Sequence, residues 1–503
     1  METIGAAVDG RTEAVRSWGE RWWGQWEDAT WVRRRVPQFM LIVLVVWYLA
    51  VFEHLVWQRQ ANYGTFDYDL GMYDQAVWLL AHGRQFMTVR GMDVFGQHAN
   101  FGFILFVPFY WLGAGAQFLD LMNTIGVVAC AIPIYFLGKR HLRSDWAGLI
   151  LGAVYLFHFI PQWMIHETFH PENIAAPALL GAFYFASVGK WRAYWWCVAF
   201  ALIWKEDVGL YVLMMGLVVL LLYKARRAGL GTMLVGAAWF LLTTRVVIPA
   251  FSPAGAVFDS LFGALGPTAT DVVINSLKHP TLFGHTLAQH KAEDGAVRMI
   301  RPLGYVPLGA PVVMLMGLPQ HIINFLSVQS FTWDPTAHYF MFPFISVMAA
   351  AVRTVISRSR VWMAWLLMAV MVIGVASTQD QGVGPWTLNS RIGFWPTVST
   401  PRDHEVATLL ARVPAGVAVS TNSLYVPHLA HRAEIYTFPN PWRSSNFGPG
   451  SKPAHRSPSR VQWMFIDRAS LTGDDATLFT QILGSGVFRP VAEEDNLYLL
   501  RRA

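Results

Sequence analysis

The sequence has few charged residues and only two cysteines. Asp, Glu, Lys and Arg together make up 14% of its 503 residues, whereas 54% are hydrophobic, which is more apolar surface than a soluble core of this length needs to bury. Both cysteines, Cys130 and Cys197, lie inside apolar runs, which argues against a disulfide scaffold or a thiolate metal site. The composition therefore predicts an α-helical polytopic membrane protein.

The excess of basic residues indicates membrane topology rather than a nucleic-acid partner. The net charge of +6 is spread over short clusters between apolar runs instead of one continuous stripe. The positive-inside rule places all of these clusters in the cytoplasm: Arg33–Arg35, Lys139–Arg143, Lys190–Arg192, Lys224–Arg227 and Arg353–Arg360. The apolar runs that connect them predict about 11 crossings. These runs are 37–57, 119–138, 146–164, 173–189, 193–204, 208–223, 228–249, 303–318, 320–331, 339–357 and 361–377.

This topology divides the chain into three parts, with the N-terminus in the cytoplasm. Residues 1–36 are polar and Trp-rich and have no cleavable signal pattern, so they are expected to form either an amphipathic helix on the cytoplasmic surface or a mobile tail. Residues 37–378 form the transmembrane domain, with outer loops at 58–118 and 250–302. Residues 379–503 form an extracytoplasmic domain.

One apolar run is assigned to the outer membrane surface rather than to a crossing. Residues 101–113 are too few to span a bilayer and include Pro108. A crossing here would also move the basic cluster Lys139–Arg143 to the outer side, against the positive-inside rule. We therefore expect a short helix lying along the surface.

A stretch of acidic residues follows the first apolar run. Asp67, Asp69 and Asp74 lie just beyond its predicted exit, where carboxylates can act on a substrate held at the membrane surface. Each of them could instead be a helix cap or a solvated loop charge, and for any single one the two interpretations are evenly matched. Together with Gly71 and Gln75 they favour a site, and which carboxylate faces it stays open.

A second outer cluster contains a His-Glu-x-x-His pattern. On one continuous helix, His166 and His170 would share a face and Glu167 would lie beside them, as in a zinc protease. Pro171 disfavours helical geometry at His170, so the pattern, extended by Glu172, favours a divalent-metal or phosphate-adjacent role over a protease. Ordinary hydrogen bonding at the membrane interface remains an alternative.

A third cluster, Lys205-Glu206-Asp207, interrupts a long apolar stretch. Charges at the bilayer centre would cost ~2.5–3.5 kcal/mol each, so the chain must turn there at the surface or in a wet cavity. The cluster is either a hairpin tip or a site in which Lys205 binds a phosphate and a carboxylate faces the acidic stretch. Because the non-basic ionisable clusters fall almost entirely on the outer side, we expect them to converge in one cavity.

From Pro401 the pattern changes to alternating helices and strands. This alternation predicts a small α/β domain outside the membrane. It has no glycine-rich phosphate loop, and substrate guidance and partner docking are equally open as its role. The expected helices are 403–412, 424–431 and 476–484, and the expected strands are 417–421, 435–438, 461–467 and 497–501.

Several short motifs resemble those of a known superfamily. They are Asp67–Gln75 with the following Ala76–Gly83, Gly96–Phe101, Leu137–Arg140 and Val426–Arg432. On these residues the chain resembles the GT-C superfamily of membrane glycosyltransferases over most of its length. Within it, the chain is similar to a bacterial branch distantly related to the protein mannosyltransferase and aminoarabinose transferase families. It differs from those relatives in having Asp67-Tyr68-Asp69 in place of an Asp-Glu pair, and His98 where many have lysine.

The resemblance implies an inverting glycosyltransferase in the plasma membrane of a bacterium. It would transfer a sugar from a polyprenyl-phosphate donor to an envelope acceptor at the outer face. Its partners would include membrane lipid but no nucleic acid. Asp69 is the expected base, because an acceptor hydroxyl needs a carboxylate to take its proton, and Asp67 and Asp74 would orient it or share a divalent metal with it. Candidate substrate-binding residues are His98, Lys205, Glu206, Asp207, Arg298, Arg301 and Tyr305, and candidate metal ligands are His166, Glu167, His170 and Glu172.

Two other classes of function are weighed against this one. A transporter or flippase of a lipid-linked or envelope precursor would place charges along a pathway and often has internal repeats, whereas here no repeat is found and the charges gather on one face. A membrane metalloprotease depends on the His-Glu-x-x-His pattern alone.

Overall fold

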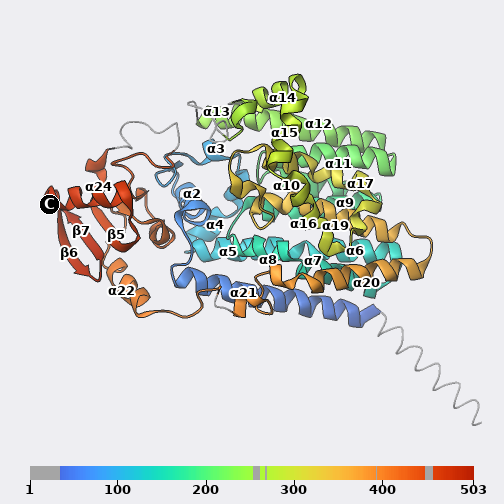
Figure 1. Ribbon diagram of the computed structural model, residues 1–503, viewed down its shortest axis with the longest axis horizontal. Coiled ribbons are helices and arrows are strands. Elements are labelled where there is room, and N and C mark those ends of the chain that lie inside the picture. Colours follow the sequence, from blue (N-terminus) through green and yellow to red (C-terminus); the bar gives the residue numbers. More distant parts are fainter. Residues whose placement is uncertain (1–33, 253–260, 267–268, 392–393, 448–456) are drawn as a thin grey trace, which may run out of the picture.

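The computed structural model describes residues 34–252, 261–266, 269–391, 394–447 and 457–503. Most of these residues form a bundle of helices, and a smaller sheet domain from the C-terminal part of the chain lies at one end of it (Figure 1). The predicted fold class, a helical membrane protein with a small C-terminal α/β domain, is therefore confirmed. The amphipathic segment predicted over 1–36 lies almost entirely outside the described residues.

Four helices of the described chain are long and apolar enough to cross a membrane. They are Arg34–Ala61, Ala116–Leu142, Arg226–Phe251 and Ser330–Ile356. A fifth crossing results if α7 (Asp145–Phe157) and α8 (Phe159–His166), which bend by 52°, count as one. Shorter apolar helices are α11 (Val208–Tyr223), Pro311–Leu326 and α20 (Val361–Ser377). The predicted count of about 11 crossings is not confirmed by this set, and it stays a prediction together with the domain limits.

The long helices contain, and are joined by, shorter elements. The bundle comprises α5 (Ala116–Ala129), α6 (Ala131–Leu142), α9 (Pro171–Ser187), α10 (Trp191–Leu202), α12 (Arg226–Leu242), α13 (Ile248–Phe251) and α19 (Met341–Ile356). Helices α11 and α12 pack closely, since a Cβ on Gly216 would lie 2.5 Å from the backbone nitrogen of Met233. Small residues at such contacts let helix backbones approach each other in a membrane.

The chain forms neither a continuous helix over 303–318 nor one over 320–331, where the sequence predicts two separate crossings. The chain forms short 3-10 turns at Arg301–Leu303 and Val306–Gly309, followed by α17 (Pro311–Met314) and α18 (Leu318–Leu326). Proline occupies the first turn of each of these pieces, where it lacks a backbone N–H and therefore interrupts or kinks a helix that comes from the residues before it. One apolar segment, Pro311–Leu326, therefore replaces the two expected helices.

Both predicted outer loops contain regular structure. The first holds α2 (Met72–Ala81), a hairpin of β1 (Phe86–Met87) and β2 (Met92–Asp93), α3 (Val94–Gln97) and α4 (Val107–Trp111); the second holds α14 (Ala269–Lys278), α15 (Pro280–Gln289) and α16 (Ala292–Ile300). The surface helix expected over 101–113 is a 3-10 turn, Phe101–Leu105, followed by α4. Its exposed apolar side chains include Phe109, Trp111 and Leu112, as expected for contact with lipid.

The C-terminal domain is a mixed five-stranded sheet in the order β4-β3-β5-β7-β6, in which β4, β3 and β5 are parallel. The sequence misses β6, an antiparallel edge strand whose residues are mostly exposed, because such a strand has little apolar alternation to detect. The elements are α21 (Leu388–Arg391), α22 (Pro401–Leu410), β3 (Val419–Thr421), α23 (Val426–Leu429), β4 (Ile435–Thr437), β5 (Trp463–Asp467), α24 (Gly473–Gly484), β6 (Phe488–Glu494) and β7 (Leu497–Arg502).

Candidate active site

Asp69 lies in a strained turn, Asp67–Gly71, that leads into α2. Tyr68 is extended with ψ of 138°, and Asp69 then adopts φ of 64° and ψ of −84°. A positive φ is rare outside glycine, and a residue held in such a conformation costs about 1–3 kcal/mol, which surrounding contacts must offset. Such strain is concentrated at functional sites, so this turn is a candidate for the position of a catalytic residue.

The turn is held from outside by the C-terminal domain. A Cβ on Gly71 would lie 2.9 Å from a methyl carbon of Val426 in α23, so only glycine permits this close approach. The Asp67 carboxylate accepts hydrogen bonds from the hydroxyls of Ser423 and Thr437. Contacts from the C-terminal domain therefore fix both the start and the end of the turn.

Asp69 meets His170, which belongs to the short linker between α8 and α9. The Asp69 Oδ2 atom lies 3.4 Å from Nε2 of His170, and 20% of the Asp69 side chain is exposed. Burial by itself would raise the pKa of the Asp69 carboxyl, but the charge of His170 outweighs it and holds the pKa below its usual value. Burial would likewise lower the pKa of His170, and Asp69 raises it instead. The pair thus favours a carboxylate beside an imidazolium.

His170 is in turn stacked on a second histidine from a distant part of the chain. The ring centroids of His170 and His338 are 3.6 Å apart with planes inclined by 18°. His338 Nδ1 lies 3.4 Å from Oε2 of Glu167. The sequence analysis did not single out His338, because one histidine at the start of an apolar run carries no local signal of its partners.

A buried ion-pair network adjoins this group. Lys205, in the linker between α10 and α11, pairs with Glu172 of α9, and its Nζ lies 3.3 Å from Oδ2 of Asp207. Only 7% of the Lys205 side chain is exposed. Burial raises the pKa of Asp207 to about 6, although the charge of Lys205 opposes this shift. The carboxylates of Glu172 and Asp207 therefore already compensate the charge of Lys205, the residue that the sequence predicted to bind the donor phosphate.

The same linker also fixes the position of the outer loop through Glu206. Its Oε1 atom lies 2.7 Å from Nδ1 of His98, and the Ala99 backbone N–H donates to Oε2 over 3.1 Å. Burial would raise the pKa of Glu206, but His98 outweighs it and lowers the pKa. The predicted convergence of outer polar clusters is thus observed for Asp69, His170 and the Lys205 network, with His98 at the edge.

Asp67 and Asp74 do not point toward Asp69. Asp67 contacts Ser423 and Thr437, and the buried Asp74 carboxylate accepts a hydrogen bond of 2.7 Å from the Tyr110 hydroxyl and lies 3.0 Å from Nε2 of His431. The extended Tyr68 and the positive φ of Asp69 turn successive side chains in different directions. The three carboxylates therefore serve different contacts, and the idea that Asp67 and Asp74 orient Asp69 or share a metal with it gains no support from them.

The four side chains proposed as metal ligands do not form one cluster. Helix α8 ends at His166, and α9 begins at Pro171 after Thr168 with φ of 72°, so the His-Glu-x-x-His pattern has no continuous helix. The His166 ring packs against Phe394 and Trp395 instead. Within the described part of the chain, no three His, Cys, Asp or Glu side chains are grouped so that they could hold a metal ion. The residues thus do not fit a metalloprotease centre.

Three predicted substrate-binding residues lie outside the Asp69 group. The guanidinium of Arg298 lies 3.3 Å from Oδ1 of Asp334, which belongs to the start of the same segment, Ser330–Ile356, that carries His338. Arg301 and Tyr305 are exposed. Arg298 is thus the one of the three whose contact reaches an element of the site.

Comparisons with known proteins agree with this architecture. The family model described as "Predicted membrane protein (DUF2079)" matches residues 61–499, and no curated protein matches the sequence. The structure of ArnT from Cupriavidus metallidurans bound to undecaprenyl phosphate is 13% identical with a TM-score of 0.51, covering 91% of this chain and 97% of that one. The structure of the same protein in the apo state is also 13% identical and has a TM-score of 0.53, covering 91% of this chain and 97% of that one. The structure of the Archaeoglobus fulgidus oligosaccharyltransferase is 13% identical and has a TM-score of 0.36, covering 87% of this chain and 70% of that one.

At 13% identity, the ArnT likeness is evidence of fold and does not transfer the role of any residue. It extends over nearly the whole of both chains, so the helical domain and the C-terminal part belong to the matched architecture together. The GT-C-like membrane fold expected from the motifs is therefore confirmed. Because the family model covers most of its length, the chain belongs to the DUF2079 family of predicted membrane proteins.

Proposed function

We propose that this protein is a glycosyltransferase that moves a sugar from a polyprenyl-phosphate donor to a hydroxyl acceptor at the outer face of the plasma membrane. The observation that carries the proposal is Asp69, a partly exposed carboxylate in a strained turn, with His170 against it and the buried Lys205 network beside them. The GT-C-like fold supports it, as does the ArnT structure, which was solved with undecaprenyl phosphate bound.

In the proposed reaction, the acceptor oxygen attacks the anomeric carbon of the donor sugar. The bond from that carbon to the phosphate oxygen breaks, and polyprenyl phosphate leaves with the electron pair. Asp69 accepts the proton of the acceptor hydroxyl, and the single displacement inverts the anomeric centre. No covalent intermediate on the protein is required, so no nucleophilic side chain is needed.

The surroundings of Asp69 suit a base that must stay ionised. His170 keeps its pKa low, and the stack of His170 on His338 holds the imidazole in place. Because two carboxylates compensate Lys205, we assign that residue to the framework of the site rather than to the donor phosphate. Asp67 and Asp74 are assigned to the contact with the C-terminal domain.

Asp69→Asn tests the proposal. Asparagine tolerates a positive φ as aspartate does, so the variant keeps the turn and removes the basicity. We expect turnover to fall by ~10²–10⁴-fold. Asp74→Asn is the matched control, because it also exchanges one carboxylate for an amide near the same turn.

The assay uses the full-length protein in vesicles. Undecaprenyl-phosphate-linked hexose, N-acetylhexosamine and aminopentose donors are supplied with a membrane fraction as the source of acceptor, and released undecaprenyl phosphate is measured by mass spectrometry. Near-normal release by Asp69→Asn would refute the assignment of the base. Movement of a lipid-linked sugar across the vesicle membrane without release of undecaprenyl phosphate would favour a transporter instead.

A further inference from the structure

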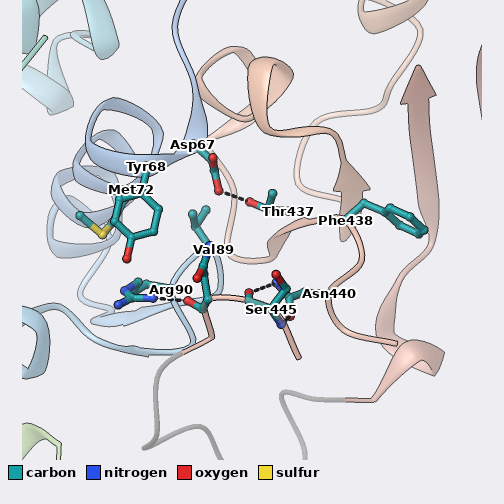
Figure 2. Close-up of a pocket in the computed structure, with 10 residues that line it drawn as sticks. Asp67, Tyr68, Met72, Val89, Arg90, Thr437, Phe438, Asn440 and Ser445 are labelled. Carbon is teal, nitrogen blue, oxygen red and sulfur yellow. Dashed lines mark hydrogen bonds between the residues drawn. The ribbon is translucent and has the colours of Figure 1, made fainter. Parts of the chain in front are cut away.

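A small cavity lies where the Asp69 turn meets the C-terminal sheet. Figure 2 shows it between the turn, the strand pair β1–β2 and the segment that follows β4. Its polar lining comes from both domains: Asp67, Tyr68 and Arg90 from the outer loop, and Thr437, Asn440 and Ser445 from the C-terminal domain. Asp69 itself does not line the cavity, but Tyr68, which does, directly precedes it and lies near enough to both Arg90 and Asp69 for their charges to act on the pKa of its hydroxyl in opposite directions.

Arg90 is a buried cation in this lining that has no counter-ion among the described residues. It is 6% exposed, its Nε donates to Gln97 Oε1 over 3.0 Å, and its guanidinium also donates to the carbonyl of Asn446. Its Cζ atom lies 5.1 Å from the ring centroid of Tyr68. No carboxylate of a described residue lies within ion-pair distance of it, in contrast to Lys205. These contacts are to neutral groups, and a buried charge that no opposite charge compensates is costly, so an anionic ligand group would be stabilised here.

The one carboxylate in the lining lies at the other end of the cavity. Figure 2 shows Asp67 directed at Thr437, whose hydroxyl donates to Oδ2 over 2.7 Å, while Ser423 donates to Oδ1. Hydroxyl donors thus occupy both oxygens of Asp67. An anion would therefore bind at the end formed by Arg90 and the neighbouring Ser445.

The size of the cavity limits what can enter. Its volume is about 40 Å³, enough for roughly three water molecules. One carboxylate or phosphate group fits such a space, whereas a whole sugar ring would have to lie at its mouth. Arginine is the side chain best suited to such groups, because its planar fork donates two parallel hydrogen bonds to them.

We propose that Arg90 and this cavity bind an anionic substituent of the acceptor, so that the acceptor is an acidic or phosphorylated saccharide whose neighbouring hydroxyl faces Asp69. The inference rests on the proposed function, because it supplies the acceptor for the same reaction. It also gives the C-terminal domain a role, since that domain forms one wall of the acceptor site.

The test measures binding of three related probes to the full-length protein in nanodiscs: methyl glucoside, methyl glucuronide and methyl glucoside 6-phosphate. Saturation-transfer NMR detects weak binding of each. We expect at least one anionic probe to bind about 10-fold or more tightly than the neutral one, as a charge-assisted hydrogen bond predicts. The anionic probe that binds identifies the group as carboxylate or phosphate. Equal binding of all three probes would overturn the proposal.

Variants then locate the binding. Arg90→Gln should abolish the preference for the anion. Ser445→Trp provides a second test that leaves the buried Arg90 in place: Ser445 is exposed and lines the cavity, so an indole there covers its mouth from outside. Its matched control is Ser444→Trp, one residue away, exposed and outside the lining. Loss of anionic-probe binding in Ser445→Trp with retention in Ser444→Trp supports the proposal, and unchanged binding in Ser445→Trp refutes it.

Asp69→Asn separates this inference from the proposed function. The variant keeps the cavity, so it should bind the anionic probe as the parent protein does while its turnover falls. Normal turnover in Asp69→Asn, with the probe still bound, would refute the base and leave the anion site standing. Loss of turnover in Asp69→Asn, with no anionic preference in the parent protein, would refute the anion site alone.

Discussion

Replacing Lys205 by methionine should destabilise the protein strongly, because it removes the cation between two buried carboxylates. The side chains of Lys205, Glu172 and Asp207 are 7%, 4% and 15% exposed. Methionine has nearly the same length, so packing changes little while Glu172 and Asp207 lose their counter-ion. Breaking one buried ion pair by removing a partner costs about 3–5 kcal/mol. We expect a loss of that size in the free energy of unfolding at pH 8.

The penalty should shrink as the pH falls. Burial already raises the pKa of Asp207 to about 6, so its ionised form is disfavoured in the folded state, and stability is gained as the pH falls through that value. Without Lys205, which opposes the shift, the pKa rises further and protonation relieves the penalty sooner. The loss measured between Lys205→Met and the parent should therefore be smaller at pH 5 than at pH 8.

The measurement is equilibrium unfolding of the detergent-solubilised protein, followed by tryptophan fluorescence. Lys139→Met is the matched control: its Nζ lies 2.8 Å from Asp145 Oδ1, but the lysine side chain is 34% exposed, and such pairs contribute about 0–1 kcal/mol. Adding Glu172→Gln to Lys205→Met should restore part of the lost stability. A cost in Lys205→Met no larger than in Lys139→Met, or no recovery in the double variant, would refute the buried network.

Two further predictions concern histidines that face carboxylates. In His170→Gln the charge that lowers the pKa of Asp69 is gone, so the acidic limb of the pH–rate profile should move to higher pH; an unchanged limb would contradict the role of His170. Burial would lower the pKa of His431, but the neighbouring Asp74 raises it above the usual histidine pKa of about 6.5. The contact therefore stabilises the fold fully below a pH of about 6.5, and this stabilisation is lost as the pH rises through the raised pKa of the folded state. Proteolytic release of the C-terminal domain from the parent protein should therefore increase as the pH rises from about 6.5 through the raised pKa of His431. In His431→Gln, the release should depend less on pH.

The sequence predicted the elements of this fold better than it predicted their contacts. Long apolar runs such as 361–377 correspond to helices almost residue for residue, since burial in lipid requires a continuous run. The C-terminal alternation gave the strands at 435–438 and 461–467 for a similar local reason. Where prolines break a run, as at 303–318, hydropathy alone predicted one long helix, whereas the backbone forms several short pieces.

The site was predictable only in part, because its geometry depends on one turn and on distant partners. The sequence singled out Asp69 and His170, but their pairing with each other was one of several possibilities. Periodicity cannot reveal the positive φ of Asp69, which sends Asp67 toward the C-terminal domain. His338 contacts His170 across 168 positions of sequence, and nothing near either residue encodes that stack.

The strain in the Asp69 turn links catalysis to the C-terminal domain. A positive φ at aspartate costs about 1–3 kcal/mol and persists only where surrounding contacts determine it. Those contacts come from the C-terminal domain: Ser423 and Thr437 bind the residue two before Asp69, and Val426 packs on the glycine two after it. If the domain moved away, the turn would be free to relax, and Asp69 would lose its alignment with His170. On this argument the C-terminal domain is a part of the proposed active site, because it maintains the backbone conformation that presents the proposed base.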